Sequence, residues 1–101
     1  MARVHIYHSY QLKKGMSEQD FLRAAEKFSN DTSLKTKGFI SWTLLKDGEM
    51  WADILVYESM DDFQNAAESI HKNPLVDELS SFFDISSIKE HRFTVAANTY
   101  K

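Results

Sequence analysis

A short turn signal near the middle of the chain constrains the fold most. Residues 39–46 and 49–58 are both rich in apolar, β-branched and aromatic side chains, and the pair Asp47-Gly48 separates them. An Asp-Gly pair between two such runs is the strongest short-range sign of a β-hairpin, with a two-residue type I′ turn. The sequence therefore predicts two antiparallel strands joined tightly at this point.

The predicted turn also fixes which residues face each other. It places Lys46 opposite Glu49 and Trp42 opposite Asp53. Because side chains alternate along a strand, the hairpin then has two faces, and both are apolar. One face carries Ile40, Trp42, Leu44, Trp51, Leu55 and Tyr57, and the other carries Phe39, Leu45, Met50, Ala52, Ile54 and Val56.

Two helices are predicted on either side of the hairpin, and their first turns are alike. The pattern Ser-x-x-Asp-Phe-x-x-Ala-Ala-Glu occurs at 17–26 and again at 59–68. In each copy the serine can cap the helix, and the apolar residues follow at helical spacing. The likeness fits either the common form of amphipathic helix starts or two equivalent strand–helix–strand halves. Asn73-Pro74 then ends the second helix and starts another helical segment.

Strands at both ends of the chain complete the pattern. Residues 3–12 and 87–97 alternate in the manner of half-buried strands. The first run puts His8 and Tyr10 on its apolar face. The last puts His91 on one face, and Glu90 and Arg92 on the other. The order strand, helix, strand, strand, helix, strand predicts an α+β fold of the ferredoxin-like βαββαβ type. Its four-stranded antiparallel sheet carries the helices on one face.

Length and composition set further limits. A chain of 101 residues fits a single domain, residues 1–101. It contains no cysteine, which excludes disulfides and thiolate metal sites. A net charge of -3 argues against nucleic acid or an anionic membrane as the main partner. No apolar run approaches the ~20 residues that span a bilayer, and the start lacks the apolar segment of a signal peptide. We therefore expect a cytoplasmic protein.

The second apolar face of the sheet predicts self-association. Helices on one side leave the other face in water, with an apolar patch larger than the few hundred Å² that soluble monomers usually expose. A second copy packing sheet to sheet about a two-fold axis would cover that patch. We expect a homodimer formed through the open sheet face.

The whole chain resembles the dimeric α+β barrel superfamily, and within it the antibiotic-biosynthesis-monooxygenase-like (ABM-like) proteins. The resemblance covers residues 3–97 and is carried by the element order, by the stretch 38–45, and by the stretch 55–59 running into Asp62-Phe63. It implies a dimeric α/β barrel with a pocket between helices and sheet in each subunit. Members of the superfamily include cofactor-free monooxygenases acting on polyphenols, haem-degrading enzymes, isomerases and proteins without known activity.

Haem degradation does not fit the residues of this chain. The haem-degrading branch uses an asparagine on the first strand, with a tryptophan and a histidine on the second helix. The corresponding positions here hold His8, Ala66, and Leu75 or Val76. Many relatives also carry a histidine one turn into the second helix, where this chain again has Ala66, so an expected acid–base group is missing.

Asp53 is the most informative single residue. A carboxylate in the middle of an apolar strand is unfavourable unless it finds partners. It is a candidate general base, or a group that orients a substrate hydroxyl. The alternative is a structural carboxylate held by the Trp42 indole, by Arg92 or Arg3, or by a histidine at the dimer interface.

His8 and His91 are the other candidate catalytic residues, because the first and last strands are neighbours in this fold. For each histidine, a merely hydrogen-bonded or solvent-facing role is the alternative. None of the histidines, which are His5, His8, His71 and His91, shows metal-ligand spacing. No metal or other cofactor is expected.

The candidate substrate-binding residues are Tyr10, Trp42, Trp51, Tyr57 and Arg92. Large aromatic side chains on one sheet face suit a flat aromatic ligand, although they suit core or interface packing equally well. Three functions remain open. The chain is a cofactor-independent monooxygenase acting on a small aromatic or hydrophobic metabolite, a dimer that binds or senses such a metabolite without turnover, or a dimer with no ligand.

Overall fold

The computed structural model describes residues 2–30 and 35–97 of the chain. Its four-stranded sheet has the order β2-β3-β1-β4, and all neighbouring strands are antiparallel. The elements in chain order are β1 (Val4–Tyr10), α1 (Glu18–Ser29), β2 (Phe39–Asp47), β3 (Met50–Tyr57), α2 (Met60–His71), α3 (Pro74–Ser80), the 3-10 turn η1 (Ile85–Ser87) and β4 (Lys89–Thr94). The predicted α+β, ferredoxin-like architecture is confirmed.

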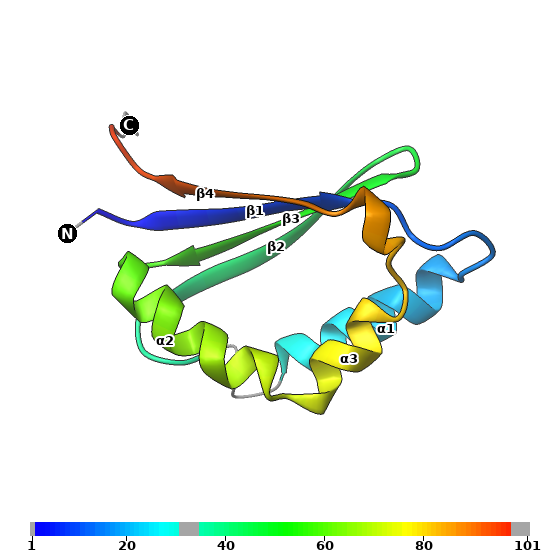
Figure 1. Cartoon of the computed structure of the whole chain (residues 1–101), viewed down its shortest axis with the longest axis horizontal. Coiled ribbons are helices and arrows are strands. Elements are labelled where there is room, and N and C mark those ends of the chain that lie inside the picture. The colour runs from blue at the N-terminus through cyan, green and yellow to red at the C-terminus, as the bar shows by residue number, and fades with distance from the viewer. Residues whose placement is uncertain (1, 31–34, 98–101) are drawn as a thin grey trace.

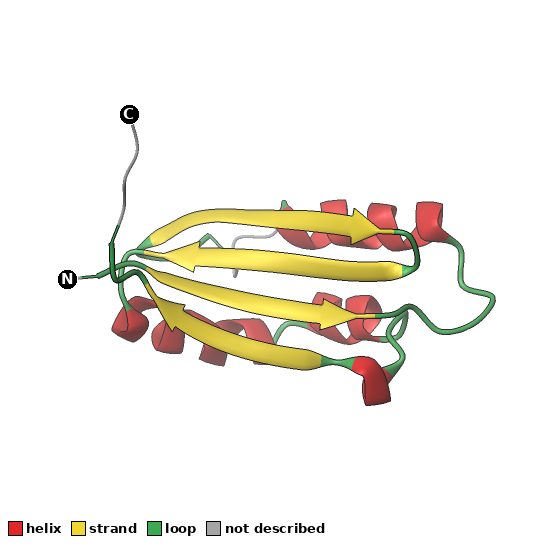
Figure 2. Ribbon diagram, turned by 90° about the horizontal axis from the view of Figure 1, so that it is seen from above, coloured by secondary structure: helices red, strands yellow, loops and turns green. Residues whose placement is uncertain are grey.

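The molecule has two layers. Figure 1 shows the three α-helices along one side of the sheet. Figure 2 looks onto the opposite side, where the four strands lie in front of the helices and no helix crosses them. The predicted arrangement, with helices on a single face, is therefore present, and no helix of the described residues covers the other, open face.

The helix starts follow the predicted caps. The Ser17 hydroxyl accepts a hydrogen bond from the Asp20 backbone N–H at 3.2 Å, and Ser59 does the same for Asp62 at 3.2 Å. Asn73 caps α3, and Pro74 occupies its first position. These side chains satisfy backbone donors that a helix start leaves without an intrahelical partner.

The hairpin turn lies one residue further along the chain than predicted. Asp47 still belongs to β2 and pairs with Met50, so the two turn residues are Gly48 and Glu49. Gly48 has φ +61°, whereas no residue other than glycine has a positive φ among the described residues. A type I′ turn needs positive φ at both central positions, and a type II′ turn needs it only at the first. The turn therefore has the glycine placement of type II′.

This displacement moves the strand register by two residues. Leu44 lies opposite Asp53, and Trp42 lies opposite Leu55 rather than opposite Asp53 as predicted. The prediction that the Trp42 indole faces Asp53 across the strands was therefore wrong. Because the shift is even, the side chains from Trp42 onwards stay on their predicted faces.

A bulge at the start of β2 corrects a second expectation. Phe39 pairs with Tyr57 and Ser41 with Val56, which leaves Ile40 as the extra residue. Phe39 was predicted on the face opposite Tyr57. Instead the two rings lie 5.9 Å apart, and Phe39 packs against the core.

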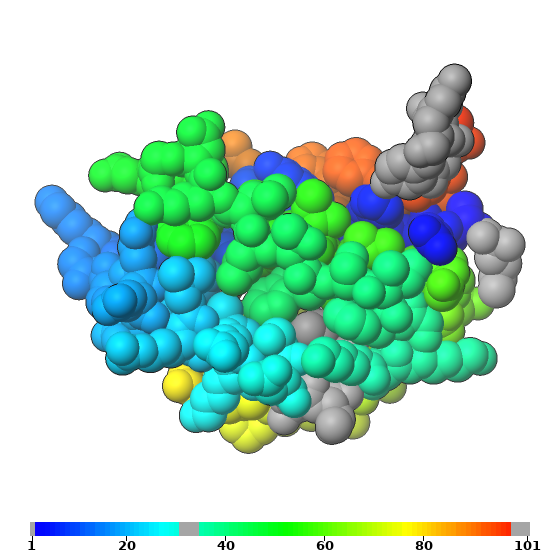
Figure 3. Space-filling view, turned by 180° about the vertical axis from the view of Figure 1, so that it is seen from behind, coloured from blue at the N-terminus to red at the C-terminus, as the bar shows by residue number. Residues whose placement is uncertain are grey.

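The core lies between the sheet and the helices. Phe21 of α1 is its fully buried centre, and its ring contacts those of Trp51 at 5.0 Å and Phe83 at 5.8 Å. Figure 3, seen from the β2 side, shows α1 packed against the underside of that edge strand. The face that carries Trp42, Trp51 and Tyr57 is therefore the covered one, a point that strand alternation alone left open.

Candidate functional site

A cavity of about 320 Å³ lies between the sheet and the helices. This volume is at the small end of the range for ligand pockets, about 300–1,000 Å³. Most of its wall is apolar: Tyr10, Phe28, Trp42, Leu55, Ile70, Val76, Leu79, Phe83 and Ile88. The polar side chains on the wall are those of His8, Asp53, His71 and Ser80. Such a site suits a small, largely apolar ligand that carries few polar groups.

A row of charged side chains crosses the sheet along one wall. The register pairs His8 with Glu90 on one side and with Asp53 on the other. His8 Nδ1 lies 3.0 Å from Asp53 Oδ1, and His8 Nε2 lies 2.9 Å from Glu90 Oε1. Side-chain exposure falls along the row, from 40% for Glu90 through 29% for His8 to 11% for Asp53. The row therefore runs from the edge of the sheet into the cavity.

The surroundings of His8 favour its charged form. Burial lowers the pKa of the imidazole, but hydrogen bonds and charges from Asp53 and then Glu90 outweigh burial, and the pKa of His8 is raised above its usual 6.5. Only the imidazolium can donate from both ring nitrogens at once. Both carboxylates accept such a bond here, so the geometry and the direction of the shift agree.

The Tyr10 hydroxyl adds a polar atom to the same wall. Tyr10 is 2% exposed, and its hydroxyl lies near the Asp53 carboxylate but makes no hydrogen bond of ordinary length among the described residues. Burial, and to a smaller extent the negative charge of Asp53 and a weak hydrogen bond to it, raises the pKa of Tyr10 well above its usual 10.0. The hydroxyl therefore stays protonated. A buried hydroxyl without a partner is costly, and a ligand that accepts its hydrogen bond would remove that cost.

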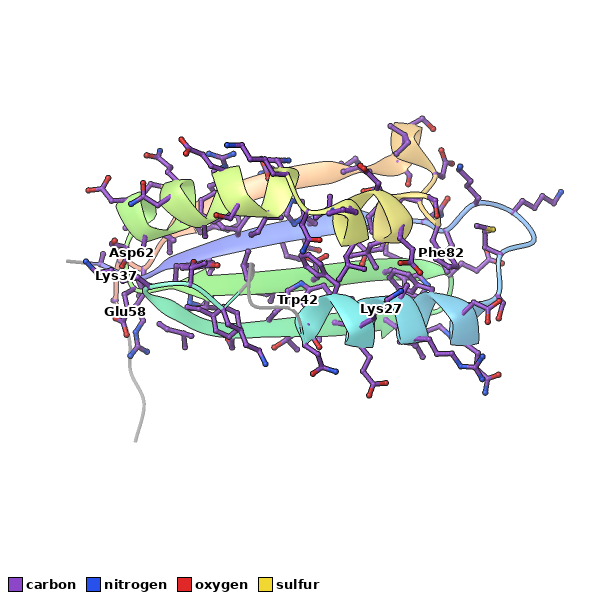
Figure 4. The ribbon with its side chains drawn as sticks, turned by 90° about the horizontal axis from the view of Figure 1, so that it is seen from below. Lys27, Lys37, Trp42, Glu58, Asp62 and Phe82 are labelled. Carbon is purple, nitrogen blue, oxygen red and sulfur yellow. The ribbon has the colours of Figure 1, made fainter. Side chains whose placement is uncertain are left out.

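Trp42, on the strand next to that of Asp53, forms a flat part of the cavity wall. Its ring lies 5.4 Å from that of Phe28 in an edge-to-face arrangement at 85°. Figure 4, seen from the helix side, shows Trp42 beside α1. Phe28 belongs to the buried stripe of that helix, so core packing fixes the position of both rings.

Solved structures share this architecture throughout the chain. A point mutant of SnoaB, a cofactor-independent oxygenase from Streptomyces nogalater, superposes with a TM-score of 0.79 at 15% identity, covering 100% of both chains. A structure of the antibiotic biosynthesis monooxygenase type from Nitrosomonas europaea gives 0.76 at 13% identity, covering 98% of this chain and 95% of its own. A conserved protein from Methanosarcina mazei gives 0.75 at 17% identity, covering 92% of each. No protein-family model and no curated protein matches the sequence.

The chain has the ABM-like fold. The resemblance identified from the sequence is thereby confirmed at the level of architecture. At these identities the likeness concerns the fold, and the chemistry of this chain must be argued from its own side chains.

Four of the eight predicted site residues line the cavity: His8, Tyr10, Trp42 and Asp53. Two others belong to its core. Trp51 packs edge-to-face on Phe21 and borders a separate hollow of about 440 Å³ at the hairpin end of the sheet. Tyr57 is fully buried between the rings of Phe39 and Phe63.

The last two predicted site residues come from β4 and lie apart. Arg92 points to the covered side, where its Nε lies 3.4 Å from Glu90 and its guanidinium 5.1 Å from the centre of the Phe63 ring. His91 pairs with Tyr7 and stacks on Phe93 on the open face. The structure does not bring His91 to the cavity, because neighbouring residues of a strand point to opposite faces.

Two residues of the site were missed by sequence reasoning. Side-chain alternation along β4 predicted only that Glu90 lies on the face opposite His91. The same alternation was the signal that could have placed Glu90 on the face of His8. His71, at the end of α2, lines the cavity. Its involvement depends on how the helix lies over the sheet, and strand and helix periodicity do not contain that information.

Two kinds of feature are absent from the part of the chain that the structure describes. Within residues 2–30 and 35–97, no group of three or more His, Asp or Glu side chains is arranged to hold a metal ion. No helix in the described part of the chain is long and apolar enough to cross a membrane.

Proposed function

We propose that this chain binds a small, flat aromatic compound with an acidic hydroxyl group, and oxidises it with O₂ without a cofactor. The observation that carries the proposal is an apolar cavity with the Asp53–His8 pair and the buried Tyr10 hydroxyl, which makes no hydrogen bond of ordinary length, on one wall. The architecture shared with SnoaB, a cofactor-independent oxygenase, supports this class of reaction.

Asp53 acts as the base in this proposal. Its Oδ1 accepts the hydrogen bond of His8, and its Oδ2 takes the proton of the ligand hydroxyl. The negative charge then moves from Asp53 to the ligand, beside the imidazolium of His8 and the hydroxyl donor of Tyr10. These two donors are already in place where the negative charge develops. They therefore stabilise the anion without reorganisation of the site.

The ligand itself supplies the electrons. The phenolate passes electron density to O₂, a ring carbon forms a C–O bond, and the resulting hydroperoxide loses water as its C–H and O–O bonds break. A phenol and O₂ thus give a quinone and one water. One oxygen atom enters the product, and both reducing electrons come from the ligand.

Binding without turnover is the second candidate, and two observations favour it. Both nitrogens of His8 are engaged by carboxylates, so this histidine has no free lone pair to act as a base. Position 66, where many relatives carry a histidine, is a buried alanine. In this alternative the cavity sequesters or senses the same class of aromatic ligand.

Oxygen uptake with a panel of phenols and quinols tests the proposal. We expect the wild-type protein to consume one O₂ per ligand oxidised, and Asp53→Asn to slow uptake by about 10²–10⁴-fold, the range for loss of a general base. Circular dichroism and thermal unfolding confirm that the variant is folded. Saturable binding without uptake establishes the binding function, and the absence of both contradicts the proposal.

We also propose that the chain forms a homodimer through the open sheet face. Leu45, Met50 and Phe93 are exposed large apolar residues there, and the helices cover only the opposite face. Leu45→Lys should convert the dimer to a monomer in sedimentation equilibrium. Leu22→Lys is the matched control, because Leu22 on α1 is 45% exposed and Leu45 is 44% exposed. A wild-type protein that is monomeric at micromolar concentration contradicts this assembly.

The cytoplasmic location and the lack of nucleic-acid and membrane partners stay predictions from charge and composition. With a net charge of -3, the protein should not be retained on heparin or on anionic vesicles at physiological salt. Retention on either would contradict the expected partners.

A further inference from the structure

The charged row contains one carboxylate more than the proposed reaction requires. Asp53 accepts the ligand proton, and one nitrogen of His8 suffices to orient Asp53. Glu90 nevertheless engages the second nitrogen at 2.9 Å. Its other oxygen, Oε2, lies 3.4 Å from Arg92 Nε, which anchors the carboxylate at the edge of the sheet.

The groups that face His8 come from each element packed around it. Asp53 lies on β3, Glu90 and Arg92 lie on β4, and Tyr10 lies two residues along its own strand. His71 of α2 lines the same cavity. Of these groups, only Asp53 and Glu90 make direct hydrogen bonds to the His8 ring.

The reaction would remove one of these two charges. When Asp53 takes the ligand proton it becomes neutral, and His8 loses the closest charge that favours its imidazolium form. Burial would then favour loss of the His8 proton. The ligand anion would be left in an apolar cavity without a countercharge, where charge is poorly screened.

We propose that Glu90 is a positioning residue that keeps His8 an imidazolium while Asp53 changes charge, so that the cavity selects ligands that bind as phenolate or enolate anions. This inference rests on the proposed function. The proton balance is closed within the site: one proton moves from the ligand oxygen to Asp53 Oδ2, and His8 keeps both of its protons. The net charge of the ligand and the row is the same before and after the transfer.

The ligand class follows from that balance. Phenols and enols can move their proton to a carboxylate, and their anions can then face the imidazolium. Aliphatic alcohols do not ionise at the pH values at which phenols do, and aromatic hydrocarbons of the same size form no anion. Both should therefore bind more weakly than phenols of equal size.

A coloured phenol provides a direct test. 4-Nitrophenol absorbs visible light only when ionised, so titration across pH reports both its affinity and its ionisation in the cavity. We expect the wild-type protein to bind the anion and to lower the pKa of the bound probe. Glu90→Gln should weaken anion binding about tenfold or more, as expected for loss of a charged hydrogen-bond partner. Binding should also be lost at a lower pH than in the wild type, because His8 releases its proton earlier.

A matched variant separates this effect from a general loss of surface charge. Glu78→Gln removes a similarly exposed carboxylate whose ion pair with Lys27, at 3.3 Å, joins α3 to α1 outside the cavity. It should leave probe affinity and its pH dependence unchanged. Glu90→Asp, which keeps the charge, should restore part of the affinity that Glu90→Gln loses.

A ligand-free measurement completes the test. In an NMR titration of the imidazole signals, Glu90→Gln should lower the pKa of His8, with the fold intact by thermal unfolding. Identical His8 titrations, or identical probe binding and pH dependence in the two proteins, would overturn this inference and leave the proposed function standing. A wild-type protein that binds no probe anion would overturn the proposed function, and this inference with it.

Discussion

The two sides of β1 carry the same kinds of residue in different surroundings. On the covered side, His8 and Tyr10 lie on the cavity wall. On the open side, His5 and Tyr7 lie on the face that none of the described helices covers. Residue type is therefore a poor guide to chemistry in this chain. Burial and the neighbouring strands decide which histidine and which tyrosine can act on a ligand.

The largest contrast between the two faces should appear in stability. Phe21→Ala removes the fully buried centre of the core and should cost about 3–5 kcal/mol of the free energy of unfolding. Phe93→Ala, on the open face, should change the free energy of unfolding of a single chain by about 0.5 kcal/mol or less. Urea denaturation measures both values.

Protein concentration sharpens this comparison. Phe21→Ala should lower the free energy of unfolding by the same amount at every protein concentration, because the core lies within one chain. Phe93→Ala should lower the free energy of unfolding only at protein concentrations at which the wild-type protein is associated. Equal losses at all concentrations for both variants would show that the open face is not an interface.

The histidines of β1 give the next largest contrast, in ligand binding. His8→Gln should weaken binding of ionisable phenols by about 10–100-fold, the effect of losing a charged hydrogen-bonding group. His5→Gln, on the other side of the same strand, should leave affinity unchanged. Calorimetric titration checks both, and equal effects would place the ligand away from the cavity. The catalytic role predicted for His91 has no support from its position on the open face.

The tyrosines should show a smaller and more selective contrast. Tyr10→Phe removes a buried hydroxyl that makes no hydrogen bond of ordinary length among the described residues, so the ligand-free protein should be as stable as the wild type or more so. Phenol affinity should fall about 3–10-fold, the value of one ordinary hydrogen bond. Tyr7→Phe should change neither quantity. A Tyr10→Phe protein with full phenol affinity would exclude the hydroxyl from ligand contact.

The smallest effect concerns the pH dependence of stability. The pKa of His8 in the folded protein is raised above its ordinary value of 6.5, so its ion pairs stabilise the fold fully below that pH. This contribution is lost as the pH rises through the folded-state pKa. The difference in free energy of unfolding between wild type and His8→Gln should therefore shrink from pH 6 to pH 9. A difference that grows from pH 6 to pH 9 would contradict a raised pKa of His8 in the folded protein.

Local patterns were sufficient for most of the fold. Side-chain alternation predicted the strands, serine caps predicted the helix starts, and element order predicted the topology. The errors arose where one residue changes the geometry. Gly48 leads the turn instead of ending it, and the extra residue Ile40 moves Phe39 to the covered face. Both depend on backbone angles that the residue types allow but do not require.

The sequence by itself determined the order of the elements, the two apolar faces of the hairpin and the presence of an isolated carboxylate, Asp53, within a strand. Only the tertiary structure decided which face the helices cover and which side chains meet. Glu90, His8 and Asp53 lie far apart in the chain and become neighbours because three strands align in one register. Alternation within a strand specifies a face, whereas contact between strands depends on register and on the helices that close the cavity.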